Sequence, residues 1–365
     1  MGRVLTRAWW SVVVTAGVLL SAGVASGGGP AAFMMSARVD GQQLEGQPLA
    51  WTDSQMLLLG RDGALYDFDP KVAQGAKKSG PAFRGYSTSE MRTRLSEEFG
   101  SGFQISTTQH FVVVHPPGQW RAWTERLELL YRSFTHSMQV RGFAVRQPPV
   151  PLVAVVFSSQ RDYYRYAAAS GTSLQPGTLG HYSPQSNRIF LFDASGGSAN
   201  ADWSANAGTI IHEATHQTAY NVGVHRRFAV QPRWLVEGLA MMFEARGVWD
   251  GRSIHTQSDR IHRSRLNDFR SRLPERRPDA LVRLIATDQP FQTEPLAAYA
   301  EAWALTFFLC ETRPQQYSEF LARVASRKPF TDYRAQERVA DFAEFFGTDF
   351  EMLDAEYTRF TSGLK

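Results

Sequence analysis

Residues 209–217 read Thr-Ile-Ile-His-Glu-Ala-Thr-His-Gln and carry a His-Glu-x-x-His motif on a segment that is typical of a helix. No glycine or proline interrupts the chain from Thr209 to Val222. Because residues four apart on a helix lie on the same face, His212 and His216 can direct two imidazoles at one metal ion. Glu213 lies about 100° further round the helix, beside such an ion and off its ligand face. Because the motif is short, two histidines on an ordinary polar helix face are the alternative interpretation.

A second helical segment, residues 232–244, supplies a candidate third ligand. Glu237 lies in an otherwise apolar run, where a lone carboxylate is costly unless it is paired or bound to a metal. The chain between His216 and Glu237 is long enough to end one helix, turn and return. One Zn²⁺ per chain is therefore predicted, held by His212, His216 and Glu237 with one coordination position left open. The alternative is an ordinary ion pair between Glu237 and Arg233.

Glu244 is predicted to support the same site. It follows Glu237 by two helical turns and so lies on the same face. A carboxylate that accepts the second N–H of a ligand imidazole fixes the tautomer of that histidine. We therefore expect Glu244 beside His212 or His216; a salt bridge from Glu244 to an arginine is the alternative.

Two stretches together resemble a known group of enzymes. Residues 212–216 (His-Glu-Ala-Thr-His) and 234–240 (Trp-Leu-Val-Glu-Gly-Leu-Ala) are similar to the gluzincin metallopeptidases, and most closely to the peptidase-MA-like group. The resemblance extends over roughly residues 150–310. The positions after His216 do not lead to a third histidine with the required spacing, which excludes the zincins with three histidine ligands.

The resemblance implies roles for particular residues. Zinc would be held by His212, His216 and Glu237, and Glu213 would be the general base. Gluzincins commonly place a tyrosine or histidine where it stabilises the oxyanion, and Tyr299, on a later helix, matches that position in order along the chain. A core tyrosine whose hydroxyl bonds to backbone is the alternative for Tyr299.

A hairpin is predicted just before the motif. Residues 178–183 and 188–193 have strand character and flank a turn that begins at Pro184. In zincins an edge strand beside the metal pairs with the substrate backbone, a general mode of peptide recognition. Position along the chain favours Gly180, His181 and Tyr182 for this role, and an ordinary hairpin without substrate contact is equally open.

The fold class predicted is α+β: a zincin-like domain with a mixed sheet and active-site helices, a small N-terminal β module and a helical C-terminal part. Residues 26–85 are expected to form the β module, with turns at Gly41 and at Asp62-Gly63 and a linker over 71–81. Residues 86–250 form the predicted core and residues 251–365 the helical subdomain. The individual expected elements are a helix capped at Ser87, strands at 110–115 and 151–157, helices at 120–140, 160–169, 297–309, 315–326, 335–346 and 350–361, and loops at 194–206 and 247–256.

The start of the chain has the order of a secretory signal peptide. Arg3 and Arg7 precede an apolar run at residues 9–24, and small residues follow near residue 25. An uncleaved anchor helix is the alternative, since the run is nearly long enough to span a membrane. We expect residues 1–25 to be removed, and the protein to be exported without stable membrane insertion.

Composition narrows the classes of partner. The formal net charge of +4 is too small to indicate a nucleic-acid partner, and the arginines between 260 and 283 alternate with acids as on a solvated helix face. The single Cys310 excludes an internal disulfide and is expected to be packed in a helix. Six other histidines have no ligand spacing and receive no role, namely His110, His115, His136, His225, His255 and His262.

The leading hypothesis is a secreted or periplasmic zinc-dependent peptidase that acts on a peptide or protein. A non-catalytic zinc-fold binding protein is one alternative, although such a protein would have no need of Glu213. A zinc hydrolase of esters or of non-peptide amides is the other. No acidic group is placed to hold a free amino terminus, which favours an endopeptidase over an aminopeptidase.

Overall fold

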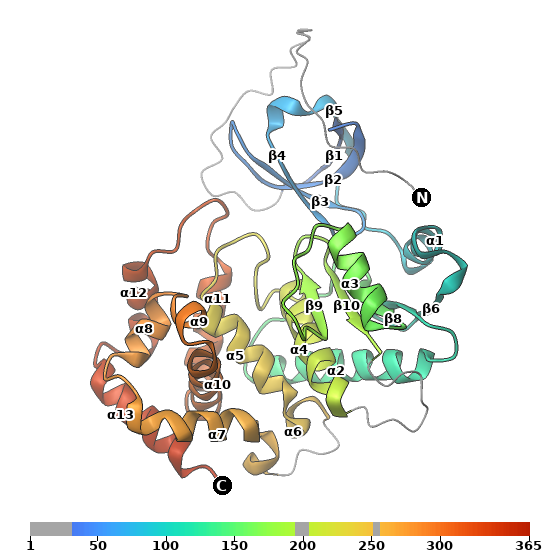
Figure 1. Cartoon of the computed structure of the whole chain (residues 1–365). Coiled ribbons are helices and arrows are strands. Elements are labelled where there is room, and N and C mark those ends of the chain that lie inside the picture. Colours follow the sequence, from blue (N-terminus) through green and yellow to red (C-terminus); the bar gives the residue numbers. More distant parts are fainter. Residues whose placement is uncertain (1–30, 194–203, 251–255) are drawn as a thin grey trace.

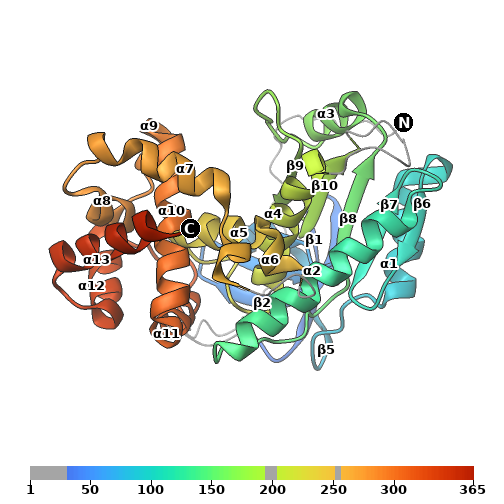
Figure 2. The same cartoon turned by 90° about the horizontal axis from the view of Figure 1, so that it is seen from below.

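The computed structural model describes residues 31–193, 204–250 and 256–365, which form the α+β fold predicted from the sequence (Figure 1). The predicted signal peptide and residues 194–203 of the predicted loop lie outside the described residues. Among the described helices, none combines the length and the apolar character needed to cross a membrane. Figure 2 shows the C-terminal helices grouped on one side of α4 and α5, with the second sheet on the other side.

The first sheet has the strand order β4-β3-β2-β1-β5, and all its neighbouring strands are antiparallel. Both predicted turns are present, with positive φ at Asp40, Gly41 and Gly63, as tight hairpin turns require. The predicted linker over 71–81 is wrong, because residues 74–80 form an edge strand on β1. This segment is polar and exposed, so only its pairing with β1 makes it a strand. The bounds are β1 (Met34–Val39), β2 (Gln42–Trp51), β3 (Met56–Gly60), β4 (Leu65–Phe68) and β5 (Gln74–Gly80).

The first sheet rests on the hairpin that precedes the motif helix. The backbone N–H of Leu65 donates to the carbonyl of Gln185, at 2.7 Å, in the hairpin turn. Arg227 joins the same two parts, because its Nη1 donates to the carbonyls of Gly63 and Pro184 at 2.9 and 3.0 Å. These hydrogen bonds hold the hairpin turn at residues 184–185 against the first sheet.

The second sheet is mixed, with the order β6-β7-β8-β10-β9. The central pairs β7–β8 and β8–β10 are parallel, and the two edge strands are antiparallel to their neighbours. Alternate residues of β7 pack on opposite faces: Phe111 and Val113 face α2 and α4, while Val112 and Val114 face α1 and α3. The bounds are β6 (Gln104–Thr107), β7 (Phe111–His115), β8 (Leu152–Phe157), β9 (Gly180–Ser183), β10 (Arg188–Phe192), α1 (Thr88–Phe99), α2 (Trp120–Val140) and α3 (Gln160–Ala169).

These elements confirm the predictions for residues 86–193. The capping box at Ser87 is formed with Glu90, and α1 ends at Gly100, whose φ is 68°. The hairpin of β9 and β10 is antiparallel, as expected, and β9 is the free edge of the sheet.

Helices α4 (Ser204–Asn221) and α5 (Arg233–Glu244) carry the two motifs, and the chain turns between them at Gly223, whose φ is 90°. The apolar helix α10 (Pro295–Thr312) packs against α5, as predicted. Gly238 allows the close approach: a Cβ there would lie 2.2 Å from Thr306 Oγ1 and 2.5 Å from the carbonyl oxygen of Ala302. Close packing on α10 therefore fixes the position of α5 at Gly238, the residue next to Glu237.

The remaining helices close the C-terminal part. Their bounds are α6 (Arg246–Trp249), α7 (Arg263–Arg272), α8 (Ala280–Ala286), α9 (Pro290–Thr293), α11 (Pro314–Ala325), α12 (Ala335–Phe346) and α13 (Phe350–Gly363). The loop predicted over 247–256 is wrong at its start, because α6 begins at Arg246, after the single extended residue Ala245 that separates it from α5. Cys310 is buried in α10, as predicted.

The arginine-rich run is only partly the solvated face predicted. The side chain of Arg276 is 10% exposed and lies between Glu301 and Asp354. A run of arginines in the sequence does not reveal which member is turned inward, because that depends on acids from two distant helices.

Candidate metal centre

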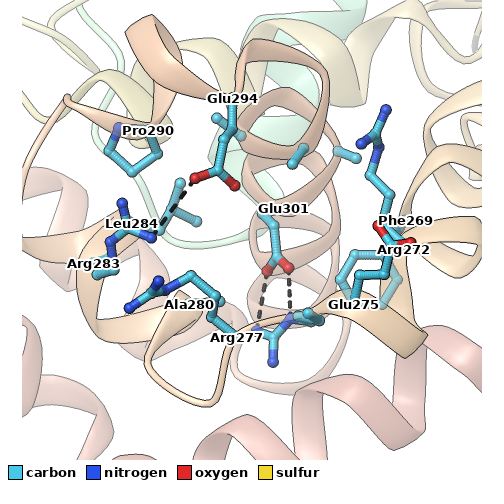
Figure 3. A pocket seen from close by; sticks show the side chains of 14 residues that line it. Phe269, Arg272, Glu275, Arg277, Ala280, Arg283, Leu284, Pro290, Glu294 and Glu301 are labelled. Carbon is cyan, nitrogen blue, oxygen red and sulfur yellow. Dashed lines mark hydrogen bonds and ion pairs between the residues drawn. The ribbon is translucent and has the colours of Figure 1, made fainter.

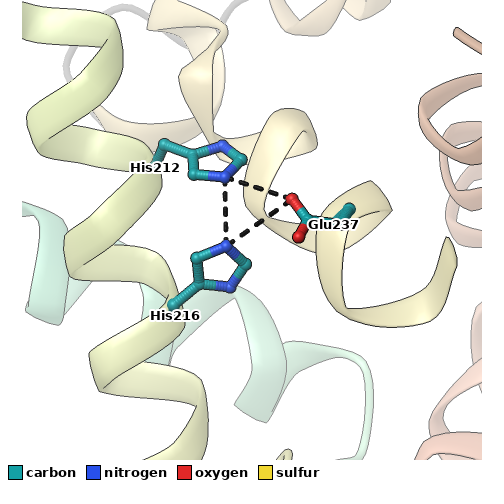
Figure 4. A group of neighbouring side chains, drawn as sticks. All are labelled: His212, His216 and Glu237. Carbon is teal, nitrogen blue, oxygen red and sulfur yellow. Dashed lines mark hydrogen bonds and ion pairs between the residues drawn. The ribbon is translucent and has the colours of Figure 1, made fainter. Parts of the chain in front are cut away.

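His212 and His216 on α4 and Glu237 on α5 direct their side chains at one point (Figure 4). The two Nε2 atoms are 3.0 Å apart. Glu237 Oε2 lies 3.3 Å from His212 Nε2 and 3.8 Å from His216 Nε2. Three ligand atoms placed tetrahedrally at about 2.0–2.2 Å from one ion would be roughly 3.3 Å apart. The predicted convergence is therefore confirmed, and the cluster has the size and the donors to hold a metal ion.

The charges of the cluster favour a bound cation. Burial acts to lower the pKa of His212, but hydrogen bonds with Glu237 and Glu244 outweigh it and raise this pKa well above its ordinary value. Burial acts to raise the pKa of Glu237, yet hydrogen bonds with His212 and His216 bring it far below its usual range. Glu237 and the two ring nitrogens thus face one another across a space where a divalent cation would interact favourably with all three.

Glu244 contacts the ring nitrogen of His212 that faces away from the cluster. Its Oε1 accepts from His212 Nδ1 at 2.7 Å, which leaves Nε2 to face the cluster. Burial raises the pKa of Glu244, but hydrogen bonds with His212 and His262 lower it to about 2. The contact predicted for Glu244 is present, and its partners are histidines.

His262, which received no role from the sequence, is the second partner of Glu244. The backbone N–H of Arg265 donates to His262 Nδ1 at 3.3 Å, so the proton of this imidazole is on Nε2. That Nε2 donates to Glu244 Oε2 at 2.8 Å. His262 thus begins a chain that runs through Glu244 to His212. Nothing in the sequence indicates this contact, since no fixed spacing links the N-cap residue of α7 to a residue of α5.

Glu213 lies beside the cluster without joining it. Its Oε2 accepts from the backbone N–H of Tyr182, on edge strand β9, at 2.6 Å. Burial raises the pKa of Glu213, and the nearby His212 and His216 act against that rise. The carboxylate is therefore aimed by the strand that was predicted to meet substrate.

The predicted strand residues have different surroundings. At Gly180 a Cβ would lie 2.3 Å from Leu191 Cδ2, so a larger residue would push β9 away from its neighbour. His181 Nδ1 is bonded to the hydroxyl of Tyr163 on α3, at 2.8 Å, and His181 is not part of the metal-type cluster. Contact between β9 and a substrate stays a prediction.

A buried polar network joins the hairpin to α4, and sequence reasoning missed it. The hydroxyl of Tyr182 donates to Asn187 Oδ1 at 2.9 Å, and Asn187 exchanges hydrogen bonds of 2.7 and 2.9 Å with Asn221. Gln217 Nε2 donates to the carbonyls of Asn187, at 2.7 Å, and Val153, at 3.0 Å. An amide directly after His216, on a helix that is otherwise apolar on that side, was the available signal.

Tyr299 is linked to the cluster through Arg233. Arg233 Nη2 donates to the Tyr299 hydroxyl oxygen at 2.9 Å, and Arg233 Nε lies 3.8 Å from Glu237 Oε1. Glu237 therefore contacts both groups: Oε2 faces the histidines, while Oε1 faces the arginine.

A separate pocket of about 120 Å³ lies between α7, α8 and α10 (Figure 3). None of its lining residues belongs to the histidine–glutamate cluster. Two of the three acids that line it are paired with arginines of the same pocket, Glu301 with Arg276 and Glu294 with Arg283. It is an ion-paired seam between helices.

A model of a protein family whose description is a protein of unknown function (DUF1570) matches residues 206–331. The match covers about a third of the chain and includes the cluster, Glu213, Glu244, His262 and Tyr299. A search of curated proteins finds no match.

Proposed function

We propose that the protein is a zinc-dependent hydrolase of peptide bonds. His212, His216 and Glu237 are the proposed ligands, and Glu213 is the proposed general base. The observation that carries this proposal is a carboxylate beside three convergent ligand atoms, off the ligand face and held by a strand edge. The resemblance to gluzincins over residues 212–216 and 234–240 supports it further.

The proposed chemistry divides between the ion and the chain. When bound, zinc would lower the pKa of a water molecule and polarise the substrate carbonyl. Glu213 takes a proton from that water as the water oxygen bonds to the carbonyl carbon. The carbon–nitrogen bond then breaks, and Glu213 passes the proton to the leaving amine. The N–H of Tyr182 holds one carboxylate oxygen, so the other is free to contact the water.

Tyr299 is the proposed oxyanion donor. Arg233 donates to its oxygen, so the proton of the hydroxyl is free to point elsewhere. A donor of this kind stabilises the negative charge that develops on the carbonyl oxygen. The edge strand at Gly180, His181 and Tyr182 is proposed to pair with the substrate backbone.

The proposed setting is extracytoplasmic. The order of residues 1–25 supports export, and a peptide or protein segment is the proposed substrate. The side chains of His212 and Glu237 are 18% and 16% exposed, so the cluster is not sealed from solvent.

Glu213→Gln tests the proposal directly. Glutamine can still contact water but cannot take its proton, so we expect hydrolysis of a peptide library to fall by roughly 10²–10⁴-fold. Zinc content, measured on the same preparation, should not change. Glu311→Gln is the matched control, because Glu311 is a well-buried carboxylate paired with Arg260 and takes no part in the centre. Cleavage by the Glu213→Gln protein at the wild-type rate would remove Glu213 as the base.

A further inference from the structure

We propose that Arg233 and Arg265, which flank the ring of Tyr299, form a subsite for a carboxylate of the substrate. The carboxylate would be an acidic side chain or the free carboxyl terminus of a peptide. The inference rests on the proposed hydrolase function, because it places this subsite next to the proposed zinc ligands.

Arg233 lies beside the centre, and within the described residues its guanidinium makes one hydrogen bond, to Tyr299, and one longer ion pair, to Glu237. It precedes Glu237 by one helical turn, and its side chain is 42% exposed. One amino group donates to Tyr299, and the guanidinium carbon lies 5.0 Å from the centre of the Phe291 ring. The guanidinium is thereby fixed in orientation on two aromatic rings while it stays open to solvent, as a recognition group must.

Arg265 approaches the same tyrosine from α7. Its guanidinium carbon lies 5.6 Å from the centre of the Tyr299 ring, and that of Arg233 lies 5.7 Å from it. Within the described part of the chain, Arg265 Nε is buried and has no hydrogen-bond partner. Because this atom is buried, a ligand oxygen would contact the accessible part of the guanidinium instead, and the side chain as a whole is 25% exposed. Its one acidic neighbour in the described residues, Asp268, lies 3.6 Å away on the same helix.

The nearby acids are already committed to other groups. Glu237 faces the two ligand histidines, and Glu244 accepts from His212 and His262. Asp288 accepts from the backbone N–H of Arg233 and forms two bonds with Arg338, at 2.8 and 3.2 Å. Each guanidinium therefore has one longer ion pair, Arg233 with Glu237 at 3.8 Å and Arg265 with Asp268 at 3.6 Å, and a substrate carboxylate would add two shorter, parallel hydrogen bonds.

The position defines what such a carboxylate would do. A substrate group on Arg233 would be close to Glu237, so the bond presented for cleavage would be near that carboxylate along the peptide. The subsite would then select acidic residues next to the cleaved bond, or the last residues of a chain. These two sources share one chemistry, and substrate design separates them.

The test uses three pools of fluorescent peptides of mixed sequence. The first has a free carboxyl terminus and no acidic residue, the second is amidated and contains Asp and Glu, and the third is amidated with Asn and Gln in their place. Binding to zinc-loaded Glu213→Gln protein is measured by fluorescence anisotropy, so that no turnover is needed. Cleavage by the wild-type protein is measured separately.

We expect the first or the second pool to bind better than the third. Arg233→Gln and Arg265→Gln should each remove that preference, with binding of the preferred pool weakened by roughly tenfold to a hundredfold. Arg165→Gln is the matched control, since Arg165 forms a similar ion pair with Asp162 three residues away at 3.4 Å, far along the chain from the centre. Preference for the first pool assigns the free carboxyl terminus, and preference for the second assigns an acidic side chain.

Several outcomes would overturn the proposal. Equal binding of all three pools, or a preference that survives both substitutions, would exclude the subsite even if peptides are cleaved. A role of Arg233 in positioning Tyr299 alone would lower kcat for every pool without changing the preference, and would also exclude it. Conversely, a carboxylate preference lost in both variants supports the subsite even if no peptide is hydrolysed, in which case only the proposed hydrolysis fails.

Discussion

Two clusters of paired carboxylates lie within the helical half of the chain. They differ in the nitrogen groups that pair with the carboxylates. At the candidate metal centre, Glu237 contacts the imidazoles of His212 and His216 (Figure 4), and Glu244 contacts those of His212 and His262. Where α10 packs on α13, Glu301 and Asp354 form ion pairs with the guanidinium of Arg276. Both clusters combine two carboxylates with nitrogen donors, and both draw on more than one helix.

The difference is in the nitrogen atoms. A guanidinium carries five N–H donors and no lone pair, so Arg276 saturates its two acids and the cluster is closed. Burial acts to lower the pKa of Arg276, but its bonds to Asp354 and Glu301 raise it. A neutral imidazole keeps one lone pair, so His212 and His216 can each give up a proton and bind a cation through Nε2, which a guanidinium cannot do. A buried carboxylate therefore does not identify a metal site until its partner is known.

Removal of zinc should have the largest effect, because it should change the stability contributed by the candidate metal centre and leave the cluster at Arg276 unchanged. We expect a chelator to lower the free energy of unfolding of the wild-type protein by about 4 kcal/mol, when the free zinc before chelation is about 1,000 times its Kd. His216→Ala should abolish this difference, because a ligand is lost. Urea denaturation with and without chelator measures both. A His216→Ala protein that is still stabilised by zinc would place the metal elsewhere.

Arg276→Met should have the next largest effect, and it should not depend on zinc. It leaves Glu301 and Asp354 buried without their partner, so we expect a loss of about 3 kcal/mol of unfolding free energy. The difference caused by the chelator should stay as in the wild type. A variant that also loses zinc would show that the two clusters are coupled through α10.

Glu244→Gln should weaken zinc binding without destroying the site. The amide can still accept from His212 Nδ1, but the charge that supports the imidazole is gone. We expect zinc affinity to fall by roughly 10- to 100-fold, measured by competition with a chelating dye. Glu311→Gln should leave the affinity unchanged. An unchanged affinity in Glu244→Gln would mean that Glu244 only packs beside the centre.

Among the described residues, the buried imidazole of His225 has no carboxylate partner, so its pKa can be compared with that of His212. Burial is the main cause that lowers the pKa of His225, to about 3, whereas that of His212 is raised. Between that value and the ordinary one the unfolded chain binds a proton that the folded chain excludes, so stability falls as the pH falls. The buried, neutral His225 should therefore lower the free energy of unfolding by about 1.4 kcal/mol at pH 5.5 relative to pH 8. His225→Leu should remove that part of the pH dependence, and substitution of the exposed His136 should not. Urea denaturation at a series of pH values measures this. If the free energy of unfolding changes with pH equally in both variants, His225 is not the cause.

Local patterns predicted much of the fold. The capping box at Ser87, the turn at Asp62-Gly63 and the long helix α2 are decided by residues close in sequence, and each was found as expected. The three convergent ligands were predicted for the same reason, since two lie on one helix and the third is the only acid in an apolar run.

The failures share a dependence on distant partners. Strand β5 has no apolar alternation, and β1 alone makes it a strand. His262 acts through Glu244, and Arg276 is turned inward by Glu301 and Asp354. In each case the deciding group is remote along the chain, so no spacing within the segment could reveal it.

The hydrogen bond from Tyr182 to Glu213 is made by the main chain, and this has a consequence for mutagenesis. Every amino acid except proline has the same N–H, so an alanine scan along β9 would not detect that this donor aims the carboxylate. Tyr182→Ala would disturb the contact with Asn187 and leave the donor in place. A proline at position 182 is the one encoded change that deletes the donor itself, and sequence variation among other residues there would give no sign of its importance.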